Sequence, residues 1–442
     1  MAGFKLLIME ERMTVSHPAK ELGKKTVVVL GGGFAGLTTA KRLANERDVF
    51  VILIDQRNHH LFQPLLYQVA TAGLSPGDIA VPIRSQFANT PNVEVHWGEV
   101  TAVDLKEQVI RSSASDLGIE YDYLVLACGA QHSYFGHPEW EEFAPGLKTL
   151  EQALEIRRRI LSAFENAENE VDPEKQKALL NFVVVGGGPT GVELAGAIAD
   201  ISRTVLVDDF RRIDPSQAKV MLVEMSPRLL ASFADDLAEK TKQDLTALGV
   251  DVRTSARVEN IDAEGVQVGS DLIPSRSVFW AAGVQAAQLR IEPPVEMDRA
   301  GRIKVKDDLS VPGHDNVFVV GDMASFEVTP GKIVPGLAPA AMQEGRHAAK
   351  VILSSIRGKE RPAFRYIDKG QMATIGKYRA VMESGGLKMT GRFAWMAWLF
   401  VHVFYLIGFK NRVGVMAQWA WSYLFSKRGA RLITERQWKL KN

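Results

Sequence analysis

The stretch Val27-Val28-Val29-Leu30-Gly31-Gly32-Gly33-Phe34-Ala35-Gly36 decides the fold of this chain. Its first four residues are apolar and mostly β-branched, which is typical of a buried strand in a parallel sheet. The glycines follow as Gly-x-Gly-x-x-Gly, and the helical pattern of residues 37–44 begins directly after them. In such a unit Gly31 permits a tight turn, Gly33 lets a pyrophosphate approach the backbone, and Gly36 lets helix and strand pack closely. The stretch therefore predicts a dinucleotide-binding turn.

A second strand and an acid complete this unit. Residues 48–54 form an apolar, strand-like run, and Asp55 follows nineteen positions beyond Gly36. An acid at that distance accepts the ribose 2′-hydroxyl of a dinucleotide. A glycine turn alone is common for structural reasons, so it is the order of strand, glycines, helix, strand and acid that favours nucleotide binding.

The same unit returns 155 residues further along the chain. Residues 181–185 predict a strand, Gly186-Gly187-Gly188-Pro189-Thr190-Gly191 the turn, and a helix follows. Glu224 takes the ribose-acid position, behind a charged insertion at about 204–219 that we expect to be a solvated loop. An acid there repels a 2′-phosphate and favours NADH over NADPH, although Arg228 lies close by in sequence. The repeat predicts two nucleotide sites, or a duplicated domain with one inactive copy.

Composition narrows the class of protein. The chain has 442 residues, enough for about two to three domains. Its formal net charge of +1 offers no electrostatic argument for nucleic-acid binding. A single cysteine, Cys128, excludes a disulfide framework, a cysteine-rich metal site and a two-cysteine redox centre within one chain. A reducing, cytoplasm-facing environment is therefore expected.

Several further elements can be placed from their patterns. We expect strands at 93–103, 123–130, 277–284 and 316–320, a hairpin region at 106–123, and helices at 151–169 and from 335 to about 356. The helix at 151–169 is expected to connect two domains. Cys128 falls inside the strand 123–130, where a buried structural thiol is the expected role.

Four polar residues have two readings each. His59 and His60 lack ligand-spaced partners, so loop or core histidines are favoured over a metal site. Glu193, in the first turn of the second helix, is either an acid favoured at a helix N-terminus or a group that handles protons beside reacting rings. Asp322 caps a helix or holds a sugar-like hydroxyl chain at the edge of a sheet.

The tail differs from the rest of the chain. From Gly376 onward it has twelve Lys and Arg but only two acids, Glu383 and Glu435. Residues 393–409 carry no charge and would reach about 25 Å as a helix, short of the roughly 30 Å hydrocarbon core of a bilayer. A second apolar stretch, 413–425, is rich in aromatic residues. These features favour a segment lying in the membrane interface over a buried or dimer helix, with true spanning as a minority alternative.

Together these residues resemble the type II NADH dehydrogenases, the single-subunit NADH:quinone oxidoreductases of the two-dinucleotide-binding-domain flavoprotein superfamily. The superfamily is marked by both glycine turns, Asp55, Glu224 and Val320-Gly321-Asp322. The narrower family is marked by residues 61–71, Glu193, Trp280-Ala281-Ala282-Gly283, the helix of Gln343 and the basic aromatic tail. The resemblance covers nearly everything from Lys24 to the C-terminus.

The resemblance implies FAD on the first turn, NADH on the second and a membrane quinone as acceptor. It places Asp55 on the FAD ribose, Asp322 on the ribityl chain, and Glu193 near nicotinamide and flavin. The family's quinone pattern Ala-Gln-x-Ala-x-Gln reads Ala338-Pro339-Ala340-Ala341-Met342-Gln343 here, so the first glutamine is a proline. Catalytic candidates are Glu193, Gln343 and Lys377, and no metal is expected. Cofactor-binding candidates are Gly31, Gly33, Phe34, Ala35, Gly36, Asp55, Gln63, Val100, Gly129, Gly186, Gly188, Pro189, Thr190, Gly191, Glu193, Glu224, Ala282, Gly283, Gly321, Asp322, Ala340 and Ala341.

The implied architecture is α/β, with two Rossmann-like domains and a C-terminal helical anchor. Its expected parts are an N-terminal extension at 1–24, an FAD domain at 25–150 and 291–385, an NADH domain at 151–290, and a membrane-anchoring region at 386–442. The apolar run in the N-terminal extension is too short for the core of a signal peptide.

The implied function is a non-proton-pumping NADH:quinone oxidoreductase of a respiratory chain, peripheral on the cytoplasmic face of a bacterial cell membrane, with a homodimer as a possible assembly. Alternatives are a reductase of a soluble electron carrier and an interaction flavoprotein like apoptosis-inducing factor. Dithiol and sulfide:quinone reductases need paired cysteines, which argues against them.

Overall fold

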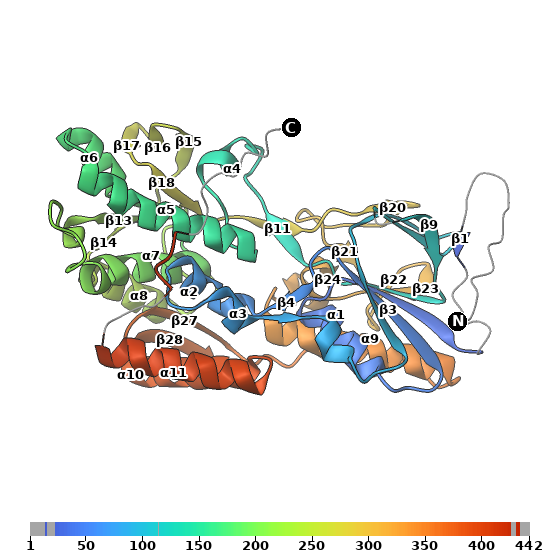
Figure 1. Ribbon diagram of the computed structural model, residues 1–442. Coiled ribbons are helices and arrows are strands. Elements are labelled where there is room, and N and C mark those ends of the chain that lie inside the picture. The colour runs from blue at the N-terminus through green and yellow to red at the C-terminus, as the bar shows by residue number, and fades with distance from the viewer. Residues whose placement is uncertain (1–13, 16–22, 114, 426–429, 434–442) are drawn as a thin grey trace. The chain divides into compact units, whose positions relative to one another are not determined.

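The computed structural model describes residues 14–15, 23–113, 115–425 and 430–433 (Figure 1). The chain forms two compact units, each assembled from separate stretches. Unit 1 contains residues 1–60, 81–131 and 284–368, and unit 2 contains residues 61–80, 132–283 and 369–442. These divisions differ from the predicted domain boundaries at 150, 290 and 385. Residues 61–80 belong to unit 2 because their helix α2 (Leu66–Ala70) packs on two helices of that unit, α5 (Leu150–Asn169) and α7 (Pro189–Asp200).

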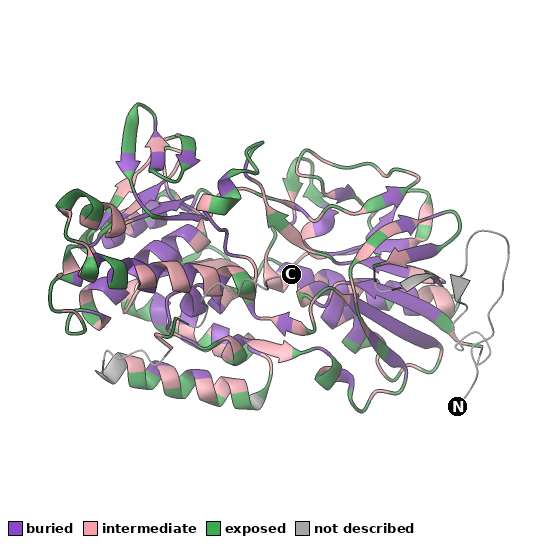
Figure 2. Cartoon of the chain, turned by 45° about the horizontal axis from the view of Figure 1, so that its top comes forward, coloured by how far each residue is buried: buried purple, intermediate pink, exposed green. Residues whose placement is uncertain are grey.

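Unit 1 is built on a six-stranded sheet in the order β22-β23-β10-β2-β3-β6. All neighbours in it are parallel except β22 and β23. The strands are β2 (Lys25–Leu30), β3 (Val49–Asp55), β6 (Val93–Trp97), β10 (Tyr123–Leu126), β22 (Ser310–Val311) and β23 (His314–Val319). Their apolar side chains form the core of the unit, and Figure 2 shows the central strands in the colour of buried residues.

Two helices, α1 (Phe34–Leu43) and α9 (Ala338–Ile356), pack on each other beside this sheet. A second sheet, in the order β1-β9-β8-β7-β20, includes the expected hairpin region. Its strands are β1 (Thr14–Val15), β7 (Val100–Asp104), β8 (Val109–Ser112), β9 (Ser115–Glu120) and β20 (Arg290–Glu292). Most of the expected N-terminal extension lies outside the described ranges, namely residues 1–13 and 16–22. Before Gly23, the structure therefore describes only the two residues of β1.

Unit 2 repeats the parallel arrangement with four strands in the order β14-β13-β12-β18. They are β12 (Asn181–Val185), β13 (Lys219–Val223), β14 (Val250–Arg253) and β18 (Ser277–Trp280). The accompanying helices are α5 (Leu150–Asn169), α6 (Pro173–Leu179), α7 (Pro189–Asp200) and α8 (Asp235–Ala247). A three-stranded meander follows as β15 (Val258–Asp262), β16 (Gly265–Val268) and β17 (Asp271–Pro274).

The tail completes unit 2. Its strands β28 (Arg379–Ser384) and β29 (Leu387–Thr390) form an antiparallel sheet with β27 (Gln371–Gly376), which leads into it. The helices α10 (Gly391–Tyr405) and α11 (Phe409–Phe425) follow (Figure 1). β27 packs so closely on α7 that a Cβ at Gly196 would lie 1.9 Å from the Ile375 carbonyl oxygen. The tail is therefore integral to the second parallel domain and not an appendage of it.

Three local expectations are corrected. The stretch 93–103 forms two strands, β6 and β7, because the N–H of Gly98 bonds to the Asp55 carbonyl and turns the chain between them. Cys128 lies beyond β10, which ends at Leu126, so it stands outside the strand; the residue as a whole is exposed, yet burial of its thiol raises the pKa of Cys128 to about 12. The apolar segment 393–409 does not form one helix, since the chain breaks between α10 and α11, where Gly408 has a φ of +90°.

Candidate functional site

The two glycine turns have nearly identical geometry. Gly31 and Gly186 adopt φ values of +102° and +113°, which disfavour any residue with a side chain. A Cβ at Gly31 would lie 2.3 Å from the Ala127 carbonyl oxygen, and one at Gly186 would lie 2.6 Å from the Ala282 nitrogen. Each turn is thus pressed against the segment that follows a neighbouring strand, and only glycine fits.

The remaining glycines divide into crowded and open positions. A Cβ at Gly36 or Gly191 would come within 2 Å of the first glycine of its own turn, so both glycines serve helix–turn packing. A Cβ at Gly33 or Gly188 would meet nothing within 4 Å. These two open glycines are the N-caps of α1 and α7, where backbone N–H groups and the helix dipole attract an anion. Both turns therefore fit the pyrophosphate of a dinucleotide.

The two ribose acids are held in the same way. The Asp55 carboxylate accepts the N–H of Gly32 at 2.5 Å and that of Arg57 at 2.6 Å. The Glu224 carboxylate accepts the N–H of Gly187 at 2.5 Å and that of Ser226 at 2.6 Å. Burial raises the pKa of Asp55, although both N–H groups oppose that shift. Each carboxylate is thus oriented by its own glycine turn.

Arg228, the cation that weakened the predicted NADH preference, is engaged elsewhere. Its guanidinium bonds to the Asp235 carboxylate and donates to the Ala231 carbonyl oxygen at 2.7 Å. The guanidinium is thus directed to Asp235, and a 2′-phosphate would meet the Glu224 carboxylate first.

Sequence reasoning undervalued His60. Its Nδ1 lies 2.9 Å from the Gly32 carbonyl oxygen, and its ring meets Phe34 edge-on at 5.0 Å. Burial lowers the pKa of His60 to about 4, so the neutral ring donates through Nδ1 to that oxygen. His60 is a buried histidine, as expected, but one that braces the first glycine turn. Among the described residues, no group of three or more His, Cys, Asp or Glu side chains could hold a metal ion.

Two other predicted positions lie at the end of β23. Gly321 and Asp322 begin the short helix η6 (Gly321–Met323), and Gly321 has a φ of +70°. The Glu344 carboxylate accepts the Gly321 N–H at 2.5 Å. Glu344 was missed, although its spacing from Ala340 and Ala348 places it on the buried stripe of α9.

Glu193 is the fifth residue of α7, just beyond the first turn in which it was expected, and its carboxylate accepts the N–H of Thr374 at 3.5 Å. The residue keeps part of its surface accessible, yet burial of the carboxylate raises the pKa of Glu193 to about 8, and the Thr374 N–H opposes this. The group therefore holds a proton near neutral pH, which suits a role in proton transfer.

The quinone candidates lie in different environments. Gln343 in unit 1 uses both donors of its amide, to the carbonyl oxygens of Pro339 at 3.1 Å and Ile367 at 3.0 Å, and its Oε1 accepts the Ile367 N–H. Lys377 in unit 2 directly follows β27, and its Nζ lies 5.4 Å from the centre of the Tyr378 ring.

The other candidates fall at element ends or in packed positions. Gly129 has a φ of +74° and open space where a Cβ would be, whereas a Cβ at Gly283 would lie 2.4 Å from the Ser133 carbonyl oxygen. Gln63 donates to the Lys148 carbonyl oxygen at 2.9 Å. Val100 begins β7 and is half-buried, while Ala340 and Ala341 are buried on α9.

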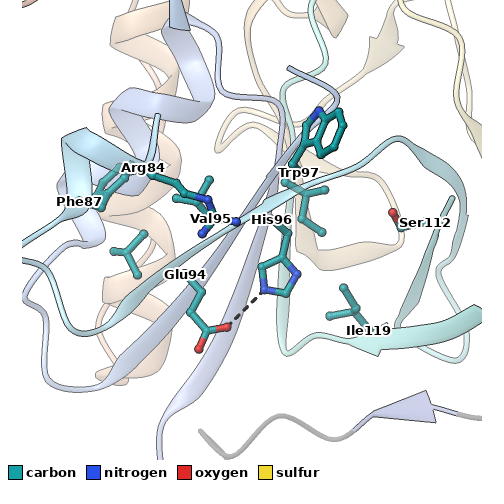
Figure 3. A pocket seen from close by; sticks show the side chains of 10 residues that line it. Arg84, Phe87, Glu94, Val95, His96, Trp97, Ser112 and Ile119 are labelled. Carbon is teal, nitrogen blue, oxygen red and sulfur yellow. Dashed lines mark hydrogen bonds and ion pairs between the residues drawn. The ribbon is translucent and has the colours of Figure 1, made fainter. Parts of the chain in front are cut away.

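A groove of about 560 Å³ runs beside the edge strand β6 of unit 1 (Figure 3). Arg84, His96 and Trp97 line it, and Figure 3 shows His96 joined to Glu94, an interaction of 3.3 Å. None of the predicted cofactor residues lines this groove, so we do not assign it to either dinucleotide.

The tail helices present apolar side chains to solvent. Phe393, Met396, Phe400 and Phe404 follow helical spacing along α10 and are all exposed. Trp398 and Trp419, in contrast, are buried. Within the described residues, no helix combines the length and apolar character needed to cross a membrane.

Comparisons with known proteins agree with this geometry. The pyridine nucleotide-disulphide oxidoreductase family matches residues 25–345, and the NDH2 C-terminal domain matches residues 369–428. The chain is 44% identical to the type II NADH:quinone oxidoreductase Ndh of Mycobacterium tuberculosis, over 93% of this chain and 90% of that protein.

Solved structures show the same fold. NDH2 from Plasmodium falciparum in complex with NADH superposes with a TM-score of 0.85 at 21% identity, over 93% of this chain and all of that one. The sulfide:quinone oxidoreductase of Aquifex aeolicus matches with a TM-score of 0.70 at 19% identity, over 91% and 95% of the two chains.

Proposed function

The chain belongs to the type II NADH:quinone oxidoreductases, and from this premise we propose how its own residues serve that reaction. The enzyme oxidises NADH, contains FAD and reduces a quinone. The observation that carries this conclusion is the identity of 44% over 93% of the chain, together with family matches that cover both glycine turns and most of the tail. Because the chain has one cysteine, it lacks the redox-active cysteine pair that disulfide chemistry requires.

We propose that FAD is held by unit 1. Gly33 leaves the N-terminus of α1 open to the pyrophosphate, and Asp55 offers carboxylate oxygens to the ribose. Asp322, at the end of β23, is the proposed partner of the ribityl chain. When bound, FAD supplies the two-electron chemistry that joins oxidation of NADH to reduction of the quinone.

NADH is proposed to bind unit 2. Gly188 opens the N-terminus of α7, and Glu224, oriented by Gly187 and Ser226, binds the ribose hydroxyls. The same carboxylate repels the 2′-phosphate of NADPH, and Arg228 is drawn away by Asp235. We expect a preference for NADH over NADPH because Glu224 repels the 2′-phosphate and Arg228, paired with Asp235, does not bind it.

Glu193 is the proposed proton-handling residue. The overall reaction consumes NADH, quinone and one proton, and yields NAD⁺ and quinol. A carboxyl group that titrates near pH 8 can both take up and deliver a proton at working pH. A lone helix-capping acid would not need the burial that produces this shift.

For the quinone, Lys377 is the stronger of the two proposed contacts. An ammonium group can donate to a quinone oxygen as negative charge develops there. Gln343 already gives both N–H donors to backbone carbonyl groups, so we propose that it clamps the segment around Ile367 to α9. Pro339, which replaces the family's first glutamine, supplies no side-chain donor.

We propose that the outer face of α10 docks on a lipid bilayer. Its exposed phenylalanines offer apolar contact, and Arg392, Lys410 and Arg412 supply cations for anionic headgroups. The cytoplasmic face of a bacterial membrane is the proposed location, since NADH is available there and a free cysteine persists in a reducing compartment. A homodimer stays a prediction of the sequence.

A quinone panel with purified protein and NADH tests the function directly. Turnover with ubiquinone or menaquinone analogues, with flavin spectra recorded in parallel, is the expected result. Flavin reduction by NADH without turnover on any quinone would instead favour an interaction flavoprotein. Turnover only with a soluble protein carrier would favour a carrier reductase.

A further inference from the structure

Glu344 is a buried acid that has no role in the reaction as described so far. It is 2% exposed and lies on α9, the helix that packs against α1. The next residue, Gly345, is so close to α1 that a Cβ there would lie 2.3 Å from the Ala35 carbonyl oxygen. A carboxyl group is rarely buried in this way unless a specific partner satisfies it.

The partner is the turn that presents Asp322. The Glu344 Oε2 accepts the Gly321 N–H at 2.5 Å, and Gly321 is held in the left-handed region with a φ of +70°. Asp322 follows directly, with its Oδ1 near Gly336, where a Cβ would lie 3.1 Å away. Glu344 therefore ties α9 to the backbone immediately before the proposed ribityl contact.

The surroundings favour the uncharged acid. Burial raises the pKa of Glu344 to about 8, the nearby charge of Asp322 adds to this, and the Gly321 N–H opposes it. Tyr366 also faces the group: burial and then the charges of Asp368 and Glu344 raise its pKa to about 12. On α1, the neighbouring Ala35 and Thr39 carry no charge.

Ionisation has two opposing effects at this site. It strengthens the hydrogen bond from Gly321, because a carboxylate is the better acceptor. It also places a second negative charge beside Asp322 in a site shielded from water, which costs more than the stronger hydrogen bond regains. The carboxylate form is therefore expected to disturb the turn.

We propose that Glu344 is a positioning residue that, while uncharged, holds the Gly321–Asp322 turn in the shape that retains FAD, and that its ionisation weakens FAD binding at alkaline pH. The inference rests on the proposed placement of FAD in unit 1. It assigns Glu344 no contact with the reacting atoms.

The test measures FAD release from purified holoenzyme between pH 6 and pH 9.5, by flavin fluorescence after desalting. The wild-type dissociation constant should rise above about pH 8, whereas Glu344→Gln, which keeps the acceptor but cannot ionise, should show no such rise. Glu344→Leu removes the acceptor and should bind FAD about tenfold more weakly at every pH. Arg346→Gln, on the exposed side of the same helix, should behave as wild type.

An unchanged alkaline release in Glu344→Gln would overturn the proposal, as would wild-type FAD affinity in Glu344→Leu. If the Leu variant fails to fold, the pH profile of the Gln variant still decides. A wild-type protein that retains no FAD at any pH would contradict the proposed function itself, and the proposed role of Glu344 in FAD binding would then be wrong as well. A merely structural role for Glu344 predicts no difference in pH profile between Glu and Gln.

Discussion

The indole N–H of Trp419 donates to the side-chain oxygen of Gln68 at 2.7 Å, across 351 positions of sequence. Gln68 in turn donates to the Tyr67 hydroxyl at 2.9 Å, and all three side chains are buried. The second tail helix is thus bonded to α2, which lies in sequence between the strands β3 and β6 of the first parallel sheet. Removing the tail would expose this network, so truncation does not separate membrane docking from folding.

Trp419→Phe should lower stability while keeping most of the ring packing. The substitution leaves the Gln68 oxygen buried without its donor, a loss of about 1–3 kcal/mol in the free energy of unfolding. Thermal unfolding of the holoenzyme measures this. Trp97→Phe is the matched control: its N–H also donates a hydrogen bond, here to the Gln56 carbonyl oxygen, but Trp97 is 69% exposed, so water can replace the donor. Equal losses in both variants would contradict the role of the buried bond.

Gly33→Ala and Gly36→Ala should fail in different ways. A methyl group at Gly33 meets no protein atom within 4 Å, so the variant should fold but bind FAD at least about tenfold more weakly, because the methyl occupies the pyrophosphate's place. At Gly36 the methyl would lie 1.9 Å from the Gly31 oxygen, so folding itself should suffer. Circular dichroism and flavin content separate the two. Full FAD retention by Gly33→Ala would contradict the proposal that this turn binds the FAD pyrophosphate.

Glu224→Gln combined with Asp235→Ala should relax the preference for NADH. The first change removes the repelling carboxylate, and the second frees Arg228 to meet a 2′-phosphate. We expect the ratio of kcat/KM for NADPH over NADH to rise by about tenfold or more. Asp235→Ala alone should have little effect, since Glu224 still repels. An unchanged ratio in the double variant would count against the ribose assignment.

Glu193→Gln should change both the pH profile of turnover and the pH dependence of stability. The folded protein holds this proton up to about pH 8, whereas an unfolded chain releases it near pH 4.5. The contribution to wild-type stability is therefore fully present below pH 4.5 and is lost as pH rises towards 8. The variant should lack this decline, retain FAD and turn over more slowly. If the variant showed the same pH profile of turnover as the wild type, Glu193 would have no part in proton transfer and would only favour the N-terminal part of its helix.

Phe400→Ser with Phe404→Ser should weaken binding to vesicles that contain anionic lipid. Both side chains are exposed, 72% and 60%, so the folded protein should keep its stability. Each phenylalanine contributes about 1.5–3 kcal/mol if it enters the bilayer, so the pair should reduce affinity at least about hundredfold. Val171→Ser, at a residue 80% exposed elsewhere in unit 2, is the control. Unchanged co-sedimentation of the double variant would rule out this face as the anchor.

The parts of the fold that follow from local chemistry could be predicted. The glycine turns, their strands and the helix α9 emerged from patterns of fewer than twenty residues each, because tight turns and buried strands restrict residue types locally. Predictions failed where one distant contact, or the conformation of one glycine, decides the backbone. The Gly98 N–H bonded to Asp55 divides one apparent strand into two, and Gly408 breaks one apparent helix.

The sequence by itself determined that two dinucleotide turns exist, that each has an acid, and that paired-cysteine chemistry is impossible. Only the tertiary structure decided what burial and hydrogen bonding do to particular side chains. It brought Glu344 to Gly321, committed both donors of Gln343 to the backbone, and joined Trp419 to Gln68. The physical reason is that a side chain's partners and desolvation depend on residues brought together by folding, which spacing along the chain does not record.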